Sequence, residues 1–209
     1  MKIYCLSGLG VDKRAFKNLV IPGVQLIHVP WILPLEQESL SNYSKRLFEQ
    51  NSFPKDYHLL GVSFGGMVAQ EFAKIQKPKK LILISTIRGN HQLPTLFKIS
   101  GKIGVQKLIP TSILKSANFF SYNLFGVKRQ ENKILLKQIL KATNSKFLKW
   151  AMSAIVCWQN KEQLEAITIH GSKDKILNPI SPNHLIKNGG HFMIVNKAKE
   201  IGEIIKNGL

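Results

Sequence analysis

Short apolar runs alternate with helical patterns along most of the chain. Runs that suit buried strands lie at residues 2–7, 24–29, 57–62, 80–85, 166–170 and, more weakly, 184–186. Between several of them, apolar residues recur at the three- and four-residue spacing of amphipathic helices. Strands that are apolar on both faces and separated by helices are typical of a parallel sheet covered on both sides. The pattern therefore predicts an α/β protein with a mostly parallel sheet of about six strands and helices on both faces.

Three helices are indicated by this spacing. The first is expected at residues 35–48, where one helical face carries Leu35, Leu40, Tyr43, Leu47 and Phe48. A second should follow residue 62 and end before Pro78, because its face carries Met67, Val68, Phe72 and Ile75. A closing helix is predicted around Ile201, Ile204 and Ile205.

The interval from residue 85 to residue 166 is too long for a structureless loop inside a compact domain. Its own spacing is helical, with apolar positions at Leu93, Leu96, Phe97, Ile134, Leu135, Ile139, Leu140, Phe147, Leu148, Trp150, Ala151, Ile155 and Trp158. We therefore expect a helical cap at 91–159, inserted into an α/β core made of 1–90 and 160–209.

The chain is strongly basic, with 30 Lys and Arg against 12 Asp and Glu and a formal net charge of +18. The excess is concentrated between His91 and Lys161, where twelve Lys and Arg stand against one acid, Glu131. Such a charge suits an anionic substrate, an acidic surface or a nucleic acid. The positive charge can also follow from composition alone, because the chain is rich in Lys, Ile and Asn, the residues that an AT-rich genome favours. Both interpretations stay open.

Cysteine usage and hydropathy indicate a soluble, cytoplasmic protein. The two cysteines, Cys5 and Cys157, are too few and too isolated for a disulfide framework or a zinc site. The first apolar run ends at Gly8, too early for a signal-peptide core, and no apolar run approaches the ~20 residues that span a bilayer. We expect no cofactor, no metal ion and no membrane span, and the sequence does not indicate an oligomeric state.

The motif Gly61-Val62-Ser63-Phe64-Gly65 carries the chemistry. It follows a predicted strand and runs directly into a predicted helix. A nucleophile on such a strand-to-helix turn has a strained backbone with close neighbours, which glycines on either side permit. Gly-x-Ser-x-Gly alone is common by chance, but this context makes Ser63 the predicted nucleophile.

A serine nucleophile needs a base, which a third group must orient. Of six histidines, His191 follows Gly189 and Gly190 on a loop between the last strand and the last helix, and so can return to the carboxyl ends of the strands. The other histidines are expected to be structural or solvated. Of three aspartates, only Asp174 follows a strand and falls between Ser63 and His191; the alternative is a turn-forming Asp.

Acyl transfer also needs hydrogen-bond donors for the developing oxyanion. The backbone N–H of Phe64, directly after the nucleophile, is the first candidate. The second is Leu9, in the loop Ser7-Gly8-Leu9-Gly10 that follows the first strand. The two glycines of that loop also suit a simple tight turn.

Over essentially its whole length the chain resembles the α/β-hydrolase superfamily, in the form of a small serine hydrolase with a helical cap. The matching segments are the loop at 7–10, the turn at 61–65, His170-Gly171-x-x-Asp174 and Gly190-His191-Phe192. The resemblance implies the order Ser, Asp, His for the catalytic triad and a cap after the strand at 80–85. Two features depart from the family pattern: Ser7 stands where many relatives carry His, and the sheet looks trimmed at its start.

The predicted reaction is hydrolysis of a carboxylic ester or thioester of a small-molecule substrate through an acyl-enzyme. Ser63 in place of Asp argues against an ester-intermediate route of the dehalogenase kind. Two alternatives stay open: a triad-dependent lyase or synthase acting on an anionic small molecule, and a ligand-binding, receptor-like relative. Specific nucleic-acid binding is not indicated, because no recognisable module is present. Trp150, Phe119 and Phe120 are the candidate substrate-binding residues.

Overall fold

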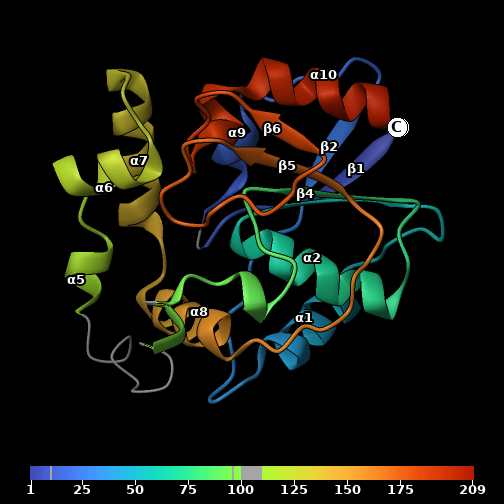
Figure 1. The fold of residues 1–209 in the computed structure, drawn as a ribbon. Helices are drawn as coiled ribbons and strands as arrows, with labels where there is room; N and C mark the ends of the chain where they lie inside the picture. The colour runs from blue at the N-terminus through green and yellow to red at the C-terminus, as the bar shows by residue number, and fades with distance from the viewer. Residues whose placement is uncertain (10, 96, 100–109) are drawn as a thin grey trace.

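The computed structural model describes residues 1–9, 11–95, 97–99 and 110–209. Its centre is a six-stranded sheet in the order β2-β1-β3-β4-β5-β6 (Figure 1). The strands are β1 (Lys2–Leu6), β2 (Gln25–His28), β3 (His58–Val62), β4 (Lys80–Ile84), β5 (Ile167–Gly171) and β6 (His184–Ile186). Each strand pairs with its neighbours in parallel. The predicted α/β class and parallel sheet are confirmed.

Helices cover both faces of the sheet (Figure 1). One face packs against α1 (Leu40–Glu49) and α2 (Phe64–Ile75). The other packs against the short helix η1 (Lys13–Phe16), α9 (Met193–Asn196) and α10 (Ala198–Gly208). Alternate residues of a strand point to opposite faces. Leu60 accordingly joins the core under α10 and Leu59 the core under α2, which explains why the strands are apolar throughout.

The chain between β4 and β5 forms further helices. They are η2 (Asn90–Gln92), α5 (Thr111–Leu114), α6 (Phe119–Phe125), α7 (Gln130–Ala142) and α8 (Ser145–Cys157). In Figure 1, α5, α6 and α7 stand at the left-hand side of the sheet, and α8 lies below them near α1. Leu96, which is part of the predicted helical spacing, lies outside the described residues. Among the residues that are described, no helix is both long enough and apolar enough to cross a membrane.

The first predicted helix begins later than expected. Helix α1 starts at Leu40 because the side chain of Ser39 accepts a hydrogen bond from the backbone N–H of Asn42 at 3.2 Å and caps the first turn. Leu35, expected on the buried face, lies before the helix and is exposed. Its N–H instead donates to the carboxylate of Glu38 at 2.9 Å. The prediction was therefore wrong for residues 35–39.

Candidate active site

The residues predicted to carry chemistry follow different strands of the sheet. Ser63 comes directly after β3, Asp174 lies just beyond β5, and His191 lies beyond β6. The loop that contains Leu9 follows β1. Because all these strands are parallel, their carboxyl ends share one edge of the sheet. The topology therefore brings four loops that are distant in sequence to one place.

Ser63 lies on a sharp turn between β3 and α2. Its backbone has φ 54° and ψ −120°, a conformation that costs energy for a residue with a side chain. The turn is held by two hydrogen bonds: the Ser63 N–H donates to the carbonyl of Ile84 at 2.9 Å, and Thr86 Oγ1 donates to the Ser63 carbonyl at 2.6 Å. The surrounding sheet thus fixes a strained backbone and exposes the side chain of Ser63 at the sheet edge.

The glycines on either side of Ser63 are required by close approach of the backbone. A Cβ on Gly61 would lie 2.5 Å from the carbonyl oxygen of Gly65, and a Cβ on Gly65 would be closer still to the carbonyl oxygens of Leu6 and Ser7. Real Cβ atoms essentially never come this near. The motif therefore lets the start of α2 pack directly against β3 and the end of β1.

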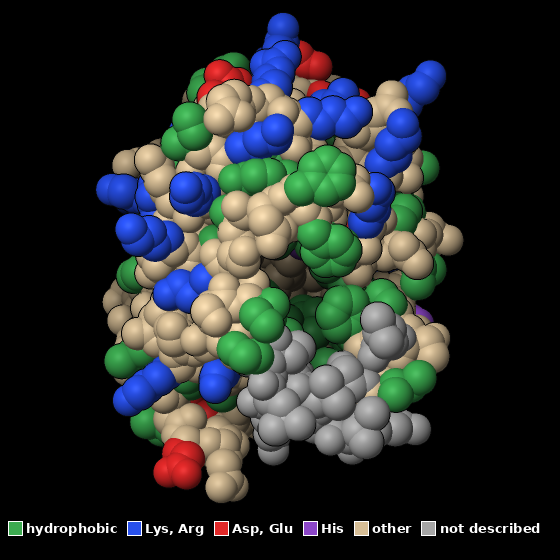
Figure 2. Space-filling model, turned by 90° about the vertical axis from the view of Figure 1, so that its left-hand side faces the viewer, with side chains coloured by type: hydrophobic (Ala, Val, Ile, Leu, Met, Phe, Trp, Pro, Cys, Tyr) green, Lys and Arg blue, Asp and Glu red, His purple; other side chains and the backbone are tan. Residues whose placement is uncertain are grey.

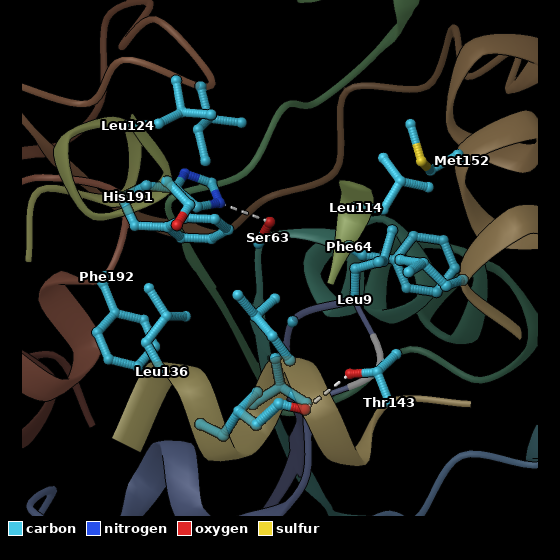
Figure 3. Close-up of a pocket in the computed structure, with 18 of the residues that line it drawn as sticks. Leu9, Ser63, Phe64, Leu114, Leu124, Leu136, Thr143, Met152, His191 and Phe192 are labelled. Atoms are coloured by element: carbon cyan, nitrogen blue, oxygen red, sulfur yellow. Dashed lines mark hydrogen bonds between the residues drawn. The ribbon is translucent and has the colours of Figure 1, made fainter. Parts of the chain in front are cut away.

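Three of the predicted residues form a hydrogen-bonded line. Ser63 Oγ lies 2.9 Å from His191 Nε2, as drawn in Figure 3, and His191 Nδ1 lies 2.8 Å from Asp174 Oδ2. An ionised carboxylate can only accept, so His191 donates its Nδ1–H to Asp174. In that tautomer Nε2 is an acceptor, and it receives the hydroxyl hydrogen of Ser63. The imidazole is thus oriented to remove a proton from the serine.

The side chain of Asp174 is completely buried, and both of its oxygens are hydrogen-bonded. Oδ1 accepts from the backbone N–H groups of Ile176 at 2.9 Å and Leu177 at 3.0 Å, while Oδ2 faces His191 and, at 3.1 Å, His170 Nε2. Burial by itself would raise the pKa of Asp174, but the hydrogen bonds from His170, His191 and the Leu177 N–H outweigh it. The pKa therefore lies well below its ordinary value, and the carboxylate stays charged.

His170, which was expected to be structural or solvated, is also part of this cluster. Its Nε2 lies 2.9 Å from the Leu177 carbonyl and 3.1 Å from Asp174 Oδ2, and because both are acceptors this nitrogen carries the proton. The side chain is buried and holds the Asp174 loop against the end of β5. A histidine at the end of a strand, four residues before the candidate acid, is the signal that could have revealed it.

The two candidate oxyanion donors lie beside Ser63. Phe64 is the first residue of α2, and the N–H groups of a first helical turn have no partner within the helix. A Cβ on Gly8 would lie 3.8 Å from Ser63 Cβ, which places the Leu9 loop against the turn. Figure 3 shows Leu9 and Phe64 on the far side of Ser63 from His191. Gly10, the last residue of the predicted loop, lies outside the described residues.

Ser7, where many relatives of the resembled superfamily carry His, is buried at the end of β1. Its hydroxyl donates to the carbonyl of Val11 and lies 3.4 Å from His28 Nε2. These contacts tie the start of the loop to its end. Elsewhere in the described ranges, no three His, Cys, Asp or Glu side chains gather in a way that could hold a metal ion.

Comparison with known proteins finds relatives by structure and not by sequence. No family model and no curated protein matches the chain. An esterase from Exiguobacterium antarcticum aligns with a TM-score of 0.74 at 17% identity, over 98% of this chain and 90% of its own. A hydrolase from Pseudomonas aeruginosa PA01 aligns at 0.72 and 16%, over 98% and 88%. A bromoperoxidase from Bacillus anthracis aligns at 0.67 and 15%, over 98% and 90%.

The chain has the α/β-hydrolase fold. The sheet edge that holds Ser63, Asp174 and His191 is the edge where open α/β sheets form their sites. Identities of this size establish the fold alone, so the function must be argued from the site.

A cavity of about 400 Å³ opens beside Ser63 and His191, between the sheet edge of the α/β-hydrolase fold and the helices that follow β4. Figure 3 shows Leu124 of α6, Leu136 of α7 and Met152 of α8 around Ser63. Polar side chains among the lining residues are few, and no Lys, Arg, Asp or Glu of the described chain lines it. Figure 2 shows its mouth as a hollow with hydrophobic side chains along the edges that are described. The interior suits an apolar ligand.

Only one of the three candidate substrate-binding residues is at this cavity. Phe120 lines it, whereas Phe119 is 86% exposed and does not. Trp150 also lies elsewhere, because its indole N–H donates to the carbonyl of Glu38 at 2.7 Å and its ring packs 4.3 Å from that of Tyr43. Leu136 and Ile139 of α7 also line the cavity but were not predicted to do so. Their spacing along the chain is that of ordinary buried positions on a helix.

Proposed function

We propose that the protein is a serine hydrolase that cleaves carboxylic esters or thioesters through an acyl-enzyme intermediate. Ser63 is the nucleophile, His191 the general base and Asp174 the acid that orients the histidine. The observation that carries the proposal is the line of hydrogen bonds from Ser63 Oγ to His191 and on to Asp174, 2.9 and 2.8 Å long. Such a line is what activates a serine hydroxyl.

The geometry supports a two-step reaction. Ser63 Oγ bonds to the substrate carbonyl carbon while its proton passes to His191 Nε2, and the backbone N–H groups of Phe64 and Leu9 stabilise the oxyanion. His191 then gives this proton to the departing alcohol or thiol, which leaves the acyl group on Ser63. In the second step a water molecule attacks the acyl-enzyme, His191 takes its proton, and that proton returns to Ser63 as the carboxylic acid is released.

The cavity indicates what the acyl group is like. Its volume, about 400 Å³, is in the range of small-molecule sites, and its lining is almost entirely apolar. A lyase or synthase that acts on an anionic substrate would need cationic side chains inside the site, and the described lining contains none. We therefore favour an uncharged substrate with an apolar acyl chain that lies among α6, α7 and α8.

In this proposal residues 91–159 form the cap, and residues 1–90 and 160–209 the catalytic core. Residues of α5, α6, α7 and α8 line the cavity together with Ser63 and His191, which supports a cap that closes over the site. The names of the structural neighbours include esterases and a hydrolase, which agrees with hydrolysis. Other neighbours are named bromoperoxidases, so the proposal rests on the site and not on the fold.

A fluorophosphonate probe tests the nucleophile without knowledge of the substrate. The probe should phosphonylate Ser63, as located by peptide mass mapping, and Ser63→Ala should remove both the adduct and esterase activity. Loss of the serine from related triads costs on the order of 10⁶ in kcat. Ser41→Ala, at an exposed position on α1, is the matched control and should leave both unchanged. An adduct on another serine, or a folded Ser63→Ala variant that keeps its activity, would contradict the proposal.

A further inference from the structure

Three large apolar side chains at the mouth of the cavity are exposed. Ile113 on α5 is 63% exposed, and Phe119 and Phe120 at the start of α6 are 86% and 70% exposed. We call these residues the apolar rim. Ile113 and Phe120 also line the cavity, so the rim lies where the cavity opens to the surface. Exposed apolar patches that are rimmed by polar residues mark interaction sites for proteins, membranes or ligands.

Basic side chains surround this rim. Lys115 directly follows α5, Lys133 lies over the ring of Tyr122 on α6 at 5.5 Å, and Lys175 donates to the side-chain carbonyl of Asn123 on α6 at 2.8 Å. Both of these contacts are with uncharged groups. Within the described residues, neither Lys133 nor Lys175 forms a salt bridge with an acidic side chain. Together with Lys128, just after α6, we call these residues the basic ring.

Acidic side chains are scarce around the basic ring. In the described residues 110–161 the one acid is Glu131, whose carboxylate lies 3.7 Å from Arg129. Figure 2 shows the same arrangement above and to the left of the hollow: hydrophobic side chains lie near the hollow, Lys and Arg spread beyond them, and acidic groups lie near the upper and lower edges. The face is therefore apolar at its centre and positive around it.

We propose that this face docks on the surface of an anionic lipid bilayer, with the mouth of the cavity turned towards the lipid. A surface of this kind binds bilayers because its apolar side chains enter the boundary between headgroups and acyl chains while its lysines lie among anionic headgroups. The docked orientation lets an apolar substrate pass from the lipid into the cavity without crossing water. Docking depends on the surface alone and not on the proposed hydrolysis.

A bilayer fits these observations better than a nucleic acid or a second copy of the chain. A nucleic acid would use the lysines, but it would leave Ile113 without a partner and give no reason for the rim to lie at the mouth of an apolar cavity. A second copy would bring the same basic ring against itself, and like charges would repel. Of these three, the anionic bilayer complements both the apolar centre and the positive surroundings.

Vesicle co-sedimentation tests the proposal. The full-length protein should bind vesicles of phosphatidylcholine with added phosphatidylglycerol and bind pure phosphatidylcholine vesicles much more weakly. Phe119→Ser should lower binding on the order of tenfold, since a buried Phe side chain is worth at least that factor. Lys115→Gln should lower it about fivefold, the value of one lysine near an anionic surface. Neither residue lines the cavity, so both variants should hydrolyse a short, water-soluble ester normally.

Matched controls come from α10 and the loop packed against it, which contribute no residue to the cavity lining. Val20, which is 74% exposed, lies beside Gly202 of α10, and Lys206 is in the last turn of the same helix. Val20→Ser and Lys206→Gln should bind vesicles as the unaltered protein does. Ser63→Ala should also bind them fully, which separates a failure of docking from a failure of the proposed hydrolysis.

Four results would overturn the proposal. Equal binding to pure phosphatidylcholine vesicles and to vesicles with phosphatidylglycerol would exclude docking through the apolar rim and the basic ring. Unchanged vesicle binding by Phe119→Ser would exclude it as well. Equally tight binding to double-stranded DNA, lowered by Lys115→Gln but not by Phe119→Ser, would assign the surface to nucleic acid. Light scattering that shows a dimer broken by Phe119→Ser would assign the surface to a second copy of the chain.

Discussion

Replacing Asp174 by asparagine tests how the site sets the tautomer of His191. Oδ1 of Asp174 accepts two backbone N–H groups, from Ile176 and Leu177, at 2.9 and 3.0 Å. An amide NH₂ cannot accept hydrogen bonds, so in Asp174→Asn the amide oxygen must keep that position. The NH₂ group then takes the Oδ2 position, 2.8 Å from His191 Nδ1, and the N–H of His170 keeps its hydrogen bond to the Leu177 carbonyl at 2.9 Å.

The forced orientation of the amide has a direct chemical consequence. His191 must accept at Nδ1 from the new NH₂ group, so its proton moves to Nε2. A protonated Nε2 cannot take the proton of Ser63, which lies 2.9 Å away. The same change in a related triad lowers kcat about 10⁴-fold, and at 1.36 kcal/mol per factor of ten this is about 5.5 kcal/mol of transition-state stabilisation. KM should change little, because Asp174 does not line the cavity.

Steady-state hydrolysis of a p-nitrophenyl ester measures this effect, with thermal unfolding as a check that the variant is folded. Asp56→Asn is the matched control, since Asp56 is exposed ahead of β3, and it should keep full activity. A folded Asp174→Asn enzyme that loses less than tenfold in kcat would refute the reasoning. An equal loss in both variants would refute it as well, because the effect would then not come from His191.

Three further expectations follow from the site. Gly65→Ala should lower stability by on the order of 1–3 kcal/mol, seen as a lower melting temperature, because the new Cβ meets the carbonyl oxygens of Leu6 and Ser7; an unchanged melting temperature would contradict this. The lowered pKa of Asp174 stabilises the fold fully above its ordinary pKa of about 3.9, so the stability advantage over Asp174→Asn in denaturant titrations should shrink only as pH falls below that value. Across p-nitrophenyl esters of growing acyl length, kcat/KM should rise about fourfold per methylene until the cavity is full, whereas a flat series would argue against an acyl site.

Local patterns were enough to predict the sheet and the turn around Ser63. Each strand is a short apolar run, and Gly61 and Gly65 are needed by contacts made within a few residues or with the adjacent strand. The first helix was placed too early because Leu35 continued the apolar spacing, while the cap formed by Ser39 decided where the helix begins. Spacing reports which residues can share a face, but capping decides where the helix starts.

The surroundings of the site depend on contacts between distant segments, which one sequence does not display. His170 and Leu177 meet only because the loop after β5 folds back on itself, and the spacing of these two residues does not reveal that contact. Trp150 was expected at the substrate because it is large and aromatic, yet the carbonyl of Glu38 takes its indole N–H. Leu136 has the spacing of any core leucine, and only the placement of α7 over Ser63 puts it at the cavity.

The same dispersion of the site along the chain bears on how the protein refolds. Ser63 and His191 are 128 positions apart in sequence, and β6, which leads to His191, joins the sheet only through β5, after the long excursion between β4 and β5. Contacts of such long range form slowly, because closing the intervening loop lowers the entropy of the chain before favourable contacts can offset that loss. Helices and the β1-β3-β4 pairing can form while the Ser63 hydroxyl still lacks its hydrogen bond to His191. Recovery of ester hydrolysis should therefore lag behind the return of the helical circular dichroism signal. The rate of that recovery would report how fast the last two strands, β5 and β6, join the sheet.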